Sequence, residues 1–199
     1  MLFVAATNNK GKLKELKRIL NQMGHEVKSQ KEVGITIEPI EDGKTFEENA
    51  IIKAKAICGE CNLPTIADDS GIEVDVLNGA PGVYTARYAG VHGDDEANNN
   101  KLLKDLLPYE KQERTAKFVS AICMYMPNGE YIITKGECEG YIGFEKIGDN
   151  GFGYDPIFNV PFYNDRSYAE LTDEEKDVIS HRGKALAKLK EKLSEFKGI

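Results

Sequence analysis

The segment Pro127-Asn128-Gly129-Glu130 constrains the fold of this 199-residue chain most strongly. It separates two segments, 116–126 and 131–138, whose composition and pattern are typical of β-strands. An Asn-Gly pair between two such segments is a strong signal for a β-hairpin. An antiparallel pair in the middle of the chain excludes a purely parallel sheet.

Segments with helical periodicity lie on both sides of this hairpin. Residues 12–23 place their apolar side chains on one stripe, and Gly24 stands where a helix often ends. The capping box Thr45-x-x-Glu48 predicts the start of a second helix, which should end between Gly59 and Pro64. A second capping box, Thr172-x-x-Glu175, predicts another helix start. Further helices are predicted over 94–107 and over 180–196, where Phe196 continues the apolar stripe.

Strands are predicted at 2–6, 65–67, 72–77 and 139–145, in addition to the hairpin. Strands and helices therefore alternate with an antiparallel element among them, which indicates an α/β fold with a central mixed sheet flanked by helices. Neither a repeat nor a linker is recognisable, and the hydrophobic content of 41% is ordinary for a globular protein. We expect residues 1–199 to form a single domain.

Charge and composition limit the partners of the chain. The net charge is −7, which argues against a protein that coats nucleic acid. No apolar run approaches the ~20 residues that span a bilayer, and the N-terminus lacks the features of a signal peptide. We therefore expect a cytoplasmic protein without a membrane partner, in which the four cysteines are free thiols.

Two segments resemble a redox motif and a phosphate-binding motif, but each lacks a feature that the motif requires. The pair Cys58-x-x-Cys61 lies at the end of a predicted helix, whereas redox pairs belong at a helix N-terminus, where the thiol pKa is lowered. Gly43-Lys44-Thr45 resembles the end of a P-loop, but the required glycine at position 38 is Glu38. The three histidines show no metal-ligand spacing.

Four groups of residues remain as candidate sites. Thr7-Asn8-Asn9-Lys10-Gly11-Lys12 connects a strand to a helix, where backbone N–H groups favour phosphate; a simple polar turn with an asparagine cap is the alternative. Glu41 and the pair Asp68-Asp69 offer carboxylates for Mg²⁺, which one or two carboxylates hold together with waters and phosphates. Because neighbours in an extended segment point to opposite faces, we expect only one of the two aspartates to face the site, and an Asx turn at a strand end is equally consistent.

The third segment is the glycine-rich loop 148–156. Phe152 and Tyr154 lie between its glycines and could stack on a base; two core aromatics in a turn are the alternative. Ser180-His181-Arg182-Gly183 begins a predicted helix, and its His-Arg pair could read an oxygen on a ring edge. An N-cap serine beside surface charges is the other interpretation.

Taken together and in order, these segments resemble the inosine triphosphate pyrophosphatase family, which cleaves non-standard purine nucleoside triphosphates. The resemblance is carried by "TNNKGK" (7–12), "TFEENAIIKA" (45–54), "IADDSGIEVDVLNGAPGVYTARYAG" (66–90), "GFGYDPIF" (151–158) and "ELTDEEKDVISHRGKAL" (170–186). It implies hydrolysis of ITP, dITP and XTP to the monophosphate and pyrophosphate, an elongated two-lobed fold with the active-site cleft between the lobes, and a homodimer.

The resemblance also implies roles for individual residues. The triphosphate would be bound by Thr7, Asn8, Asn9, Lys10, Gly11 and Lys12, with Lys53 adding charge. Glu41 and Asp69 would hold Mg²⁺, Asp69 would also accept the proton of the attacking water, and Ser70 would contact the substrate. The base would be bound by Phe152, Gly153, Tyr154, Asp155, Lys176, His181 and Arg182, with Phe152 stacking on the ring.

One position departs from the family pattern, because Asn150 stands where a second glycine is expected before Gly151. Two other functions stay open on the sequence. A nucleotide sensor without turnover would not need a water-activating carboxylate, and an enzyme of the same fold could act on other nucleotides, such as modified pyrimidine triphosphates. A panel of substrates separates these alternatives.

Overall fold

The computed structural model describes residues 1–195, with side chains placed as far as residue 193. The described chain forms two compact units. Unit 1 consists of Met1–Asp69, Ser120–Gly136 and the segment that begins at His181. Unit 2 consists of Ser70–Val119 and Glu137–Ser180. The two units are described separately below.

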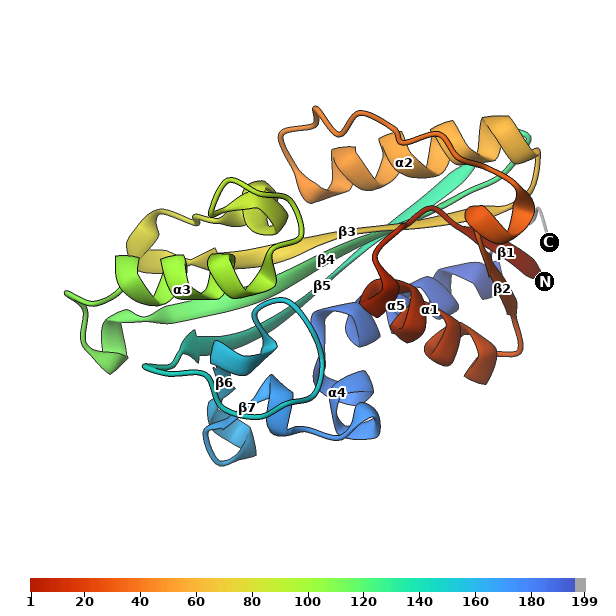
Figure 1. The fold of residues 1–199 in the computed structure, drawn as a ribbon. Coiled ribbons are helices and arrows are strands. Elements are labelled where there is room, and N and C mark those ends of the chain that lie inside the picture. Colours follow the sequence, from red (N-terminus) through yellow and green to blue (C-terminus); the bar gives the residue numbers. More distant parts are fainter. Residues whose placement is uncertain (196–199) are drawn as a thin grey trace. The chain divides into compact units, whose positions relative to one another are not determined.

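The secondary structure is mixed throughout the described residues (Figure 1). The helices are α1 (Lys10–Gln22), α2 (Phe46–Cys61), α3 (Asp95–Asp105), α4 (Asp173–Ile179) and α5 (His181–Glu195). The strands are β1 (Leu2–Ala5), β2 (Glu26–Ser29), β3 (Thr65–Val74), β4 (Thr115–Tyr125), β5 (Tyr131–Ile142), β6 (Phe158–Val160) and β7 (Arg166–Ser167).

The strands form a mixed sheet in the order β2-β1-β3-β4-β5-β6-β7. β1 runs parallel to β2, with Phe3 opposite Val27, and parallel to β3, with Val4 opposite Thr65. β6 runs antiparallel to both β5 and β7. The predicted α/β fold with a mixed sheet is therefore confirmed.

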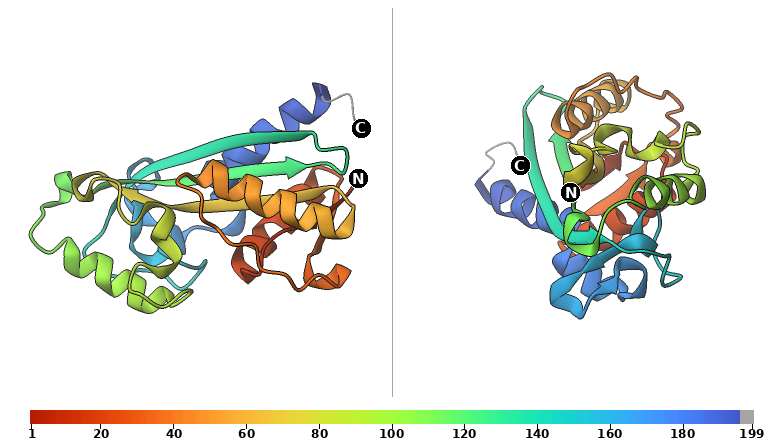
Figure 2. Two further views of the ribbon diagram at one scale, coloured as in Figure 1. Left: turned by 90° about the horizontal axis from the view of Figure 1, so that it is seen from above. Right: turned by 90° about the vertical axis from the view of Figure 1, so that its left-hand side faces the viewer.

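In unit 1 the strands lie between two layers of helices. One face of the strands, with Phe3 and Ile122, packs against Leu16 of α1 and Leu186 of α5 in a single buried cluster. Helix α2 covers the other face, as the three views agree (Figures 1 and 2). Gly136 permits close packing on β5, because a Cβ there would lie 2.1 Å from the carbonyl oxygen of His181 at the start of α5.

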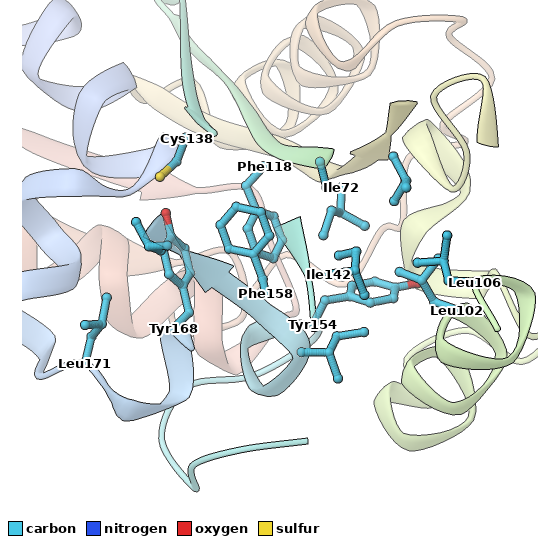
Figure 3. Packing of buried hydrophobic residues seen from close by; sticks show 14 of the residues in the cluster. Ile72, Leu102, Leu106, Phe118, Cys138, Ile142, Tyr154, Phe158, Tyr168 and Leu171 are labelled. Carbon is cyan, nitrogen blue, oxygen red and sulfur yellow. The ribbon is translucent and has the colours of Figure 1, made fainter. Parts of the chain in front are cut away.

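Unit 2 has a hydrophobic core of its own (Figure 3). The rings of Phe118 and Phe158 meet edge to face at 4.7 Å between centroids, and Tyr168 packs against both. Tyr154 lies in the same cluster as Leu102 of α3 and Leu106, which directly follows that helix. The core therefore fixes α3 and the residues that precede β6 to one another.

Several predicted features are confirmed. The hairpin closes with Met126 N–H donating to the Glu130 carbonyl at 2.8 Å, and Gly129 has a φ of +90°. Gly24 follows α1 with a φ of +82°, as expected of a helix-ending glycine. The capping box of Thr172 precedes α4, and the four cysteines are free.

Other boundaries were predicted wrongly. The segments 65–67 and 72–77 are one strand to Val74, and the strand expected at 139–145 is the end of β5. By contrast, the predicted end of α2 between Gly59 and Pro64 is confirmed, since the helix continues to Cys61 and stops at Asn62 in the left-handed conformation. Phe196, expected on the last helix, lies outside the described residues.

The Thr45 capping box is half formed. The Thr45 hydroxyl accepts from the Glu48 N–H, but the Glu48 carboxylate accepts from the N–H of Lys44 instead of that of Thr45.

Among the described helices, none combines the length and the apolar composition that crossing a bilayer requires.

Candidate active site

The first group of site residues is presented by helix α2. Asn49 and Lys53 are one turn apart and therefore share a face of the helix. Both side chains are buried, at 4% and 9% exposure, although asparagine and lysine rarely are. Buried polar groups of this kind need partners, and both residues find them on β3.

Lys53 joins two carboxylates that are distant in sequence. Its ammonium group donates to Glu41 Oε2 at 2.8 Å, to Asp69 Oδ1 at 2.7 Å and to the Asp68 carbonyl at 3.1 Å. These three bonds use all three donors of the ammonium group. The structure thus brings together Glu41, Lys53 and Asp69, which the sequence singled out.

Asn49 holds the other oxygen of Asp69. Its amide nitrogen donates to Asp69 Oδ2 at 3.2 Å, and its amide oxygen accepts from the Gly43 N–H at 2.9 Å. One side chain therefore orients the Asp69 carboxylate and ties it to the loop that carries Glu41. Both oxygens of Asp69 are fixed, which is what a positioned catalytic carboxylate needs.

The surroundings move the pKa values of the two carboxylates apart. Burial raises the pKa of Asp69 above its ordinary value, and Lys53 and Lys12 only partly oppose that effect. For Glu41 burial acts in the same sense, but the nearby Lys53 ammonium outweighs it and lowers the pKa. Lys53 in turn has a raised pKa, since Asp69 and Glu41 outweigh its burial. Asp69 is thus the more basic carboxylate of the pair.

The donor set fits a small divalent cation bound with substrate. Among the side chains placed in residues 1–193, no three or more of His, Cys, Asp and Glu converge into an all-protein metal site. Two carboxylates, Glu41 and Asp69, do converge on one cation, the Lys53 ammonium. Mg²⁺ needs few protein carboxylates when substrate phosphates and water complete its coordination.

Asp68 points to the other side of the strand and into a different network. Its carboxylate accepts from the Ser120 hydroxyl at 2.6 Å and from Arg182 at 2.8 Å, and Lys12 Nζ lies 3.3 Å away. Arg182 also pairs with Glu15 of α1. The network therefore ties β3, β4, α1 and α5 together at one buried point of unit 1.

This network holds Asp68 in the charged form. Burial alone would raise the pKa of this fully buried carboxyl, but the Arg182 guanidinium and the Lys12 ammonium hold it well below its usual range. The prediction that the two aspartates face different surroundings is confirmed, and Asp69 is the one in contact with Lys53 and Asn49.

The predicted phosphate loop lies at the N-terminus of α1, in unit 1. Asn9 caps the helix by accepting from the Lys12 N–H at 3.0 Å, and Thr7 accepts from the Asn9 N–H at 3.1 Å. Asn8 donates to Glu38 at 3.1 Å, while Lys10 is exposed. Gly11 occupies the first helical turn, whose N–H groups face the helix end.

The predicted base loop lies in unit 2. The Asp155 carboxylate is buried at 3% exposure and accepts from the Phe152 N–H at 2.9 Å and from Lys176 Nζ at 2.5 Å. The Lys176 ammonium lies 5.2 Å from the centroid of the Phe152 ring. Phe152, Asp155 and Lys176, which the sequence placed in the base pocket, therefore form one cluster.

Gly151 and Tyr154 have structural tasks in this loop. Gly151 has a φ of +82°, and a Cβ there would lie 2.0 Å from Asp155 Oδ2. Tyr154 is buried at 3% exposure and donates its hydroxyl to the Thr85 carbonyl, so Phe152 is the aromatic residue that keeps exposed surface. Asn150 does not have a positive φ, so the local backbone does not require glycine there.

The remaining predicted residues are placed as follows. Ser70 follows Asp69 in β3 and is half-buried. His181 and Arg182 begin α5 in unit 1, and both are buried. The side chain of Arg182 is 1% exposed and is engaged by Asp68 and Glu15. A direct contact of Arg182 with a base stays a prediction.

Sequence reasoning missed Asn49, Ser120 and Glu15. Asn49 carried a usable signal, since it lies next to Ala50 on the apolar stripe of the predicted helix and shares that stripe with Lys53. Ser120 is the one hydroxyl in a run of apolar strand residues. Glu15 gave no comparable signal, because α1 carries charges over most of its surface.

Comparison with known proteins gives consistent matches over the whole chain. A model of the Ham1 family matches residues 3–192. The dITP/XTP pyrophosphatase of Clostridium perfringens is 49% identical over 203 residues, covering 99% of this chain and 98% of the relative. The dITP/XTP pyrophosphatase of Bacillus subtilis is 51% identical over 190 residues, covering 96% of each chain.

Solved structures agree with these matches. The Ham1 protein of Staphylococcus aureus superimposes with a TM-score of 0.84 at 44% identity, covering 98% of this chain and 99% of that one. The resemblance inferred from the five sequence segments is thereby confirmed.

Proposed function

The chain belongs to the Ham1 family, and on that premise we propose that it hydrolyses dITP, XTP and ITP to the monophosphate and pyrophosphate. Its task in the cell would be to remove these nucleotides from the pool. The observation that carries the proposal is the convergence of Glu41, Lys53 and Asp69 on one point between α2 and β3. A sensor without turnover has no need for a basic carboxylate at that point.

Asp69 is the residue that we assign to water activation. Its carboxylate is held by Lys53 and Asn49, and burial raises its pKa above that of an ordinary carboxyl. A raised pKa makes the carboxylate a better proton acceptor. Asp69 would take a proton from the water that attacks the α-phosphorus, and the pyrophosphate would leave.

The positive charges of unit 1 are assigned to the triphosphate. Lys12 and Lys53 are partly or fully buried, and the first turn of α1 adds the N–H groups of Lys10 and Gly11. Neutralising charge on the phosphates is the main requirement in phosphoryl transfer. Thr7, Asn8 and Asn9 would complete the phosphate contacts, and Ser70 would contact the substrate beside Asp69.

Mg²⁺ is the cofactor that we propose, with Glu41 and Asp69 as its protein ligands. Two carboxylates that already converge on one cation, Lys53, are suited to hold it together with the substrate. When bound, Mg²⁺ would neutralise charge on the phosphate oxygens.

Recognition of the base is assigned to the cluster in unit 2. Phe152 offers a ring for stacking, and Lys176 offers a donor that Asp155 fixes in place. A fixed donor suits the 6-oxo group of hypoxanthine or xanthine, whereas the 6-amino group of adenine would leave it unpaired. Gly153 and Tyr154 would shape the loop, and contacts of His181 and Arg182 with the base are implied by the family resemblance.

We further propose that the enzyme is a cytoplasmic homodimer without nucleic-acid or membrane partners. Light scattering coupled to size exclusion should then give twice the chain mass of 22.1 kDa. A mass of one chain at micromolar concentration would contradict the dimer and leave the chemistry untouched.

The experiment that tests the proposed function is a product assay on a substrate panel. dITP, XTP, ITP, ATP, GTP and a modified pyrimidine triphosphate are each incubated with and without Mg²⁺, and pyrophosphate is measured separately from orthophosphate. We expect Mg²⁺-dependent pyrophosphate from the first three and little from the others. Orthophosphate from every substrate would identify a general phosphatase, and tight binding without product would identify a sensor.

A further inference from the structure

Both backbone polar groups of Gly153 are held by one helix outside the base loop. The Gly153 N–H donates to Asp95 Oδ2 at 2.8 Å. The Gly153 carbonyl accepts from Asn99 Nδ2, also at 2.8 Å. Asp95 and Asn99 are four residues apart and so share a face of α3, more than fifty positions from the loop in sequence.

The residues on either side of Gly153 lie in different surroundings. Tyr154 is anchored in the core of unit 2 beside Leu102 of the same helix and Leu106, which directly follows it (Figure 3). Phe152, on the other side, keeps part of its ring exposed and lies over Lys176. Gly153 is thus the link between a fixed core residue and the ring assigned to the base.

Gly153 also has a backbone that needs external support. Its φ of +62° is open to glycine, which is the most flexible residue when it is not constrained. Asn99 is buried at 4% exposure, so its bond to the Gly153 carbonyl is shielded from water. The pair on α3 therefore restrains the glycine that joins Phe152 to Tyr154.

We propose that Asp95 and Asn99 are positioning residues, which fix the Gly153 peptide and through it the orientation of the Phe152 ring. The assignment deepens the proposed function and rests on it for the role of Phe152. Neither residue lies within the loop itself, and both act on the base only through Gly153. We call the two hydrogen bonds from Asp95 and Asn99 to Gly153 the clamp. Loss of the clamp should therefore weaken selection of the base more than it slows the chemical step.

Asp95 accepts a hydrogen bond from Gly153, whereas Asn99 donates one to it, so each bond can be removed by a different substitution. Asp95→Asn keeps an oxygen that can accept from the Gly153 N–H, whereas Asp95→Ala removes it. Asn99→Asp has nearly the same shape but sets a carboxylate oxygen against the Gly153 carbonyl oxygen, so the bond becomes a repulsion. Asn100→Asp is the matched control, because it adds the same charge to the exposed neighbouring position.

The clamp is first tested without nucleotide by hydrogen exchange of the peptide that contains residues 150–156. We expect exchange about fivefold faster in Asp95→Ala and Asn99→Asp, the scale of one hydrogen bond. Asp95→Asn and Asn100→Asp should exchange like the wild type. Unchanged exchange in both Asp95→Ala and Asn99→Asp would overturn the clamp. Because Asp95 lies near the surface, Asp95→Ala tests the clamp even if Asn99→Asp does not fold.

Kinetics then test the consequence for the base. In Asp95→Ala and Asn99→Asp, KM for XTP should rise about tenfold with a smaller change in kcat, while inhibition by pyrophosphate, which has no base, stays at the wild-type level. If pyrophosphate inhibition weakened in these variants as much as XTP binding does, the substitutions would have disturbed the whole active site. That result would overturn the positioning role. A wild type that releases no pyrophosphate would refute the proposed function, and the exchange result would still decide the clamp.

Discussion

Asp68 and Asp69 are neighbours in β3 with opposite surroundings. Asp68 is enclosed by Arg182, Ser120 and Lys12, which keep it charged and lower its pKa. Asp69 contacts Lys53 and Asn49, and burial raises its pKa. The alternation of a strand separates them, so one carboxylate can organise unit 1 while the other remains basic enough for chemistry.

Asp69→Asn should abolish turnover without unfolding the protein. The amide has the shape of the carboxylate but can neither accept a proton from water nor bind a cation as strongly. We expect kcat for XTP to fall by roughly 10² to 10⁴-fold, measured as pyrophosphate release. Asp42→Asn, which removes a charge from an exposed residue of the same unit, serves as control. Wild-type kcat in Asp69→Asn would refute the assigned role.

Asp68→Asn should reduce stability in a pH-dependent way. The pKa of Asp68 is lower in the folded than in the unfolded state, so its contribution to stability is complete above pH ~4 and declines below that value. We expect a loss of about 3 kcal/mol in the free energy of unfolding near pH 7, because a buried pair is broken.

Urea titrations at several pH values measure this effect. The gap between wild type and Asp68→Asn should stay constant from about pH 7 to pH 5 and narrow below about pH 4. Asp42→Asn should show no such gap at any pH. A gap that persists unchanged into strong acid would mean that the charge of Asp68 is not what stabilises unit 1.

The sequence predicted the chemistry of these residues better than their partners. Glu41, Lys53 and Asp69 were singled out and do converge. Asn49 supports Asp69, whereas Ser120 contacts Asp68 and Glu15 contacts Arg182, and these partners lie 20, 52 and 167 positions apart in the chain. The local pattern marks Asn49 and Ser120 as polar residues among apolar ones, but which partners they meet depends on the packing of elements.

At the scale of elements, β3 differs most from its prediction. The sequence predicted two strands, 65–67 and 72–77, with Asp68-Asp69-Ser70-Gly71 between them, and aspartate is depleted in strands. The structure continues the strand through it, because both carboxylates are paired with cations. A strand that carries charged residues at its centre is recognisable only when their partners are known.

Helix α2 provides a prediction at this scale, because it carries Asn49 and Lys53. Thr45→Ala removes the hydroxyl that accepts from the Glu48 N–H and should cost about 1 kcal/mol in the free energy of unfolding. Thr36→Ala, at an exposed position outside any helix, is the control. Urea titration of both variants measures the difference, and equal stability would show that the cap does not support α2.

At the scale of the whole molecule, the hairpin sufficed to predict a mixed sheet within an α/β fold. Its order, β2-β1-β3-β4-β5-β6-β7, was not predictable, since strand neighbours such as β1 and β3 are separated by two helices in sequence. The division of the described residues into two compact units leaves no local pattern in the sequence, and two lobes were expected from the family resemblance alone. It depends on long-range packing, as the separate clusters around Phe3 and Phe158 show.

The most direct test of the account follows the oxygen of the attacking water. XTP is hydrolysed with Mg²⁺ in water enriched in oxygen-18, and the products are separated for mass spectrometry. Water activated by Asp69 and directed at the α-phosphorus predicts one labelled oxygen in the monophosphate and an unlabelled pyrophosphate. Label in the pyrophosphate would mean attack at the β-phosphorus, and labelled orthophosphate would mean stepwise removal of phosphates; either result would contradict the proposed reaction.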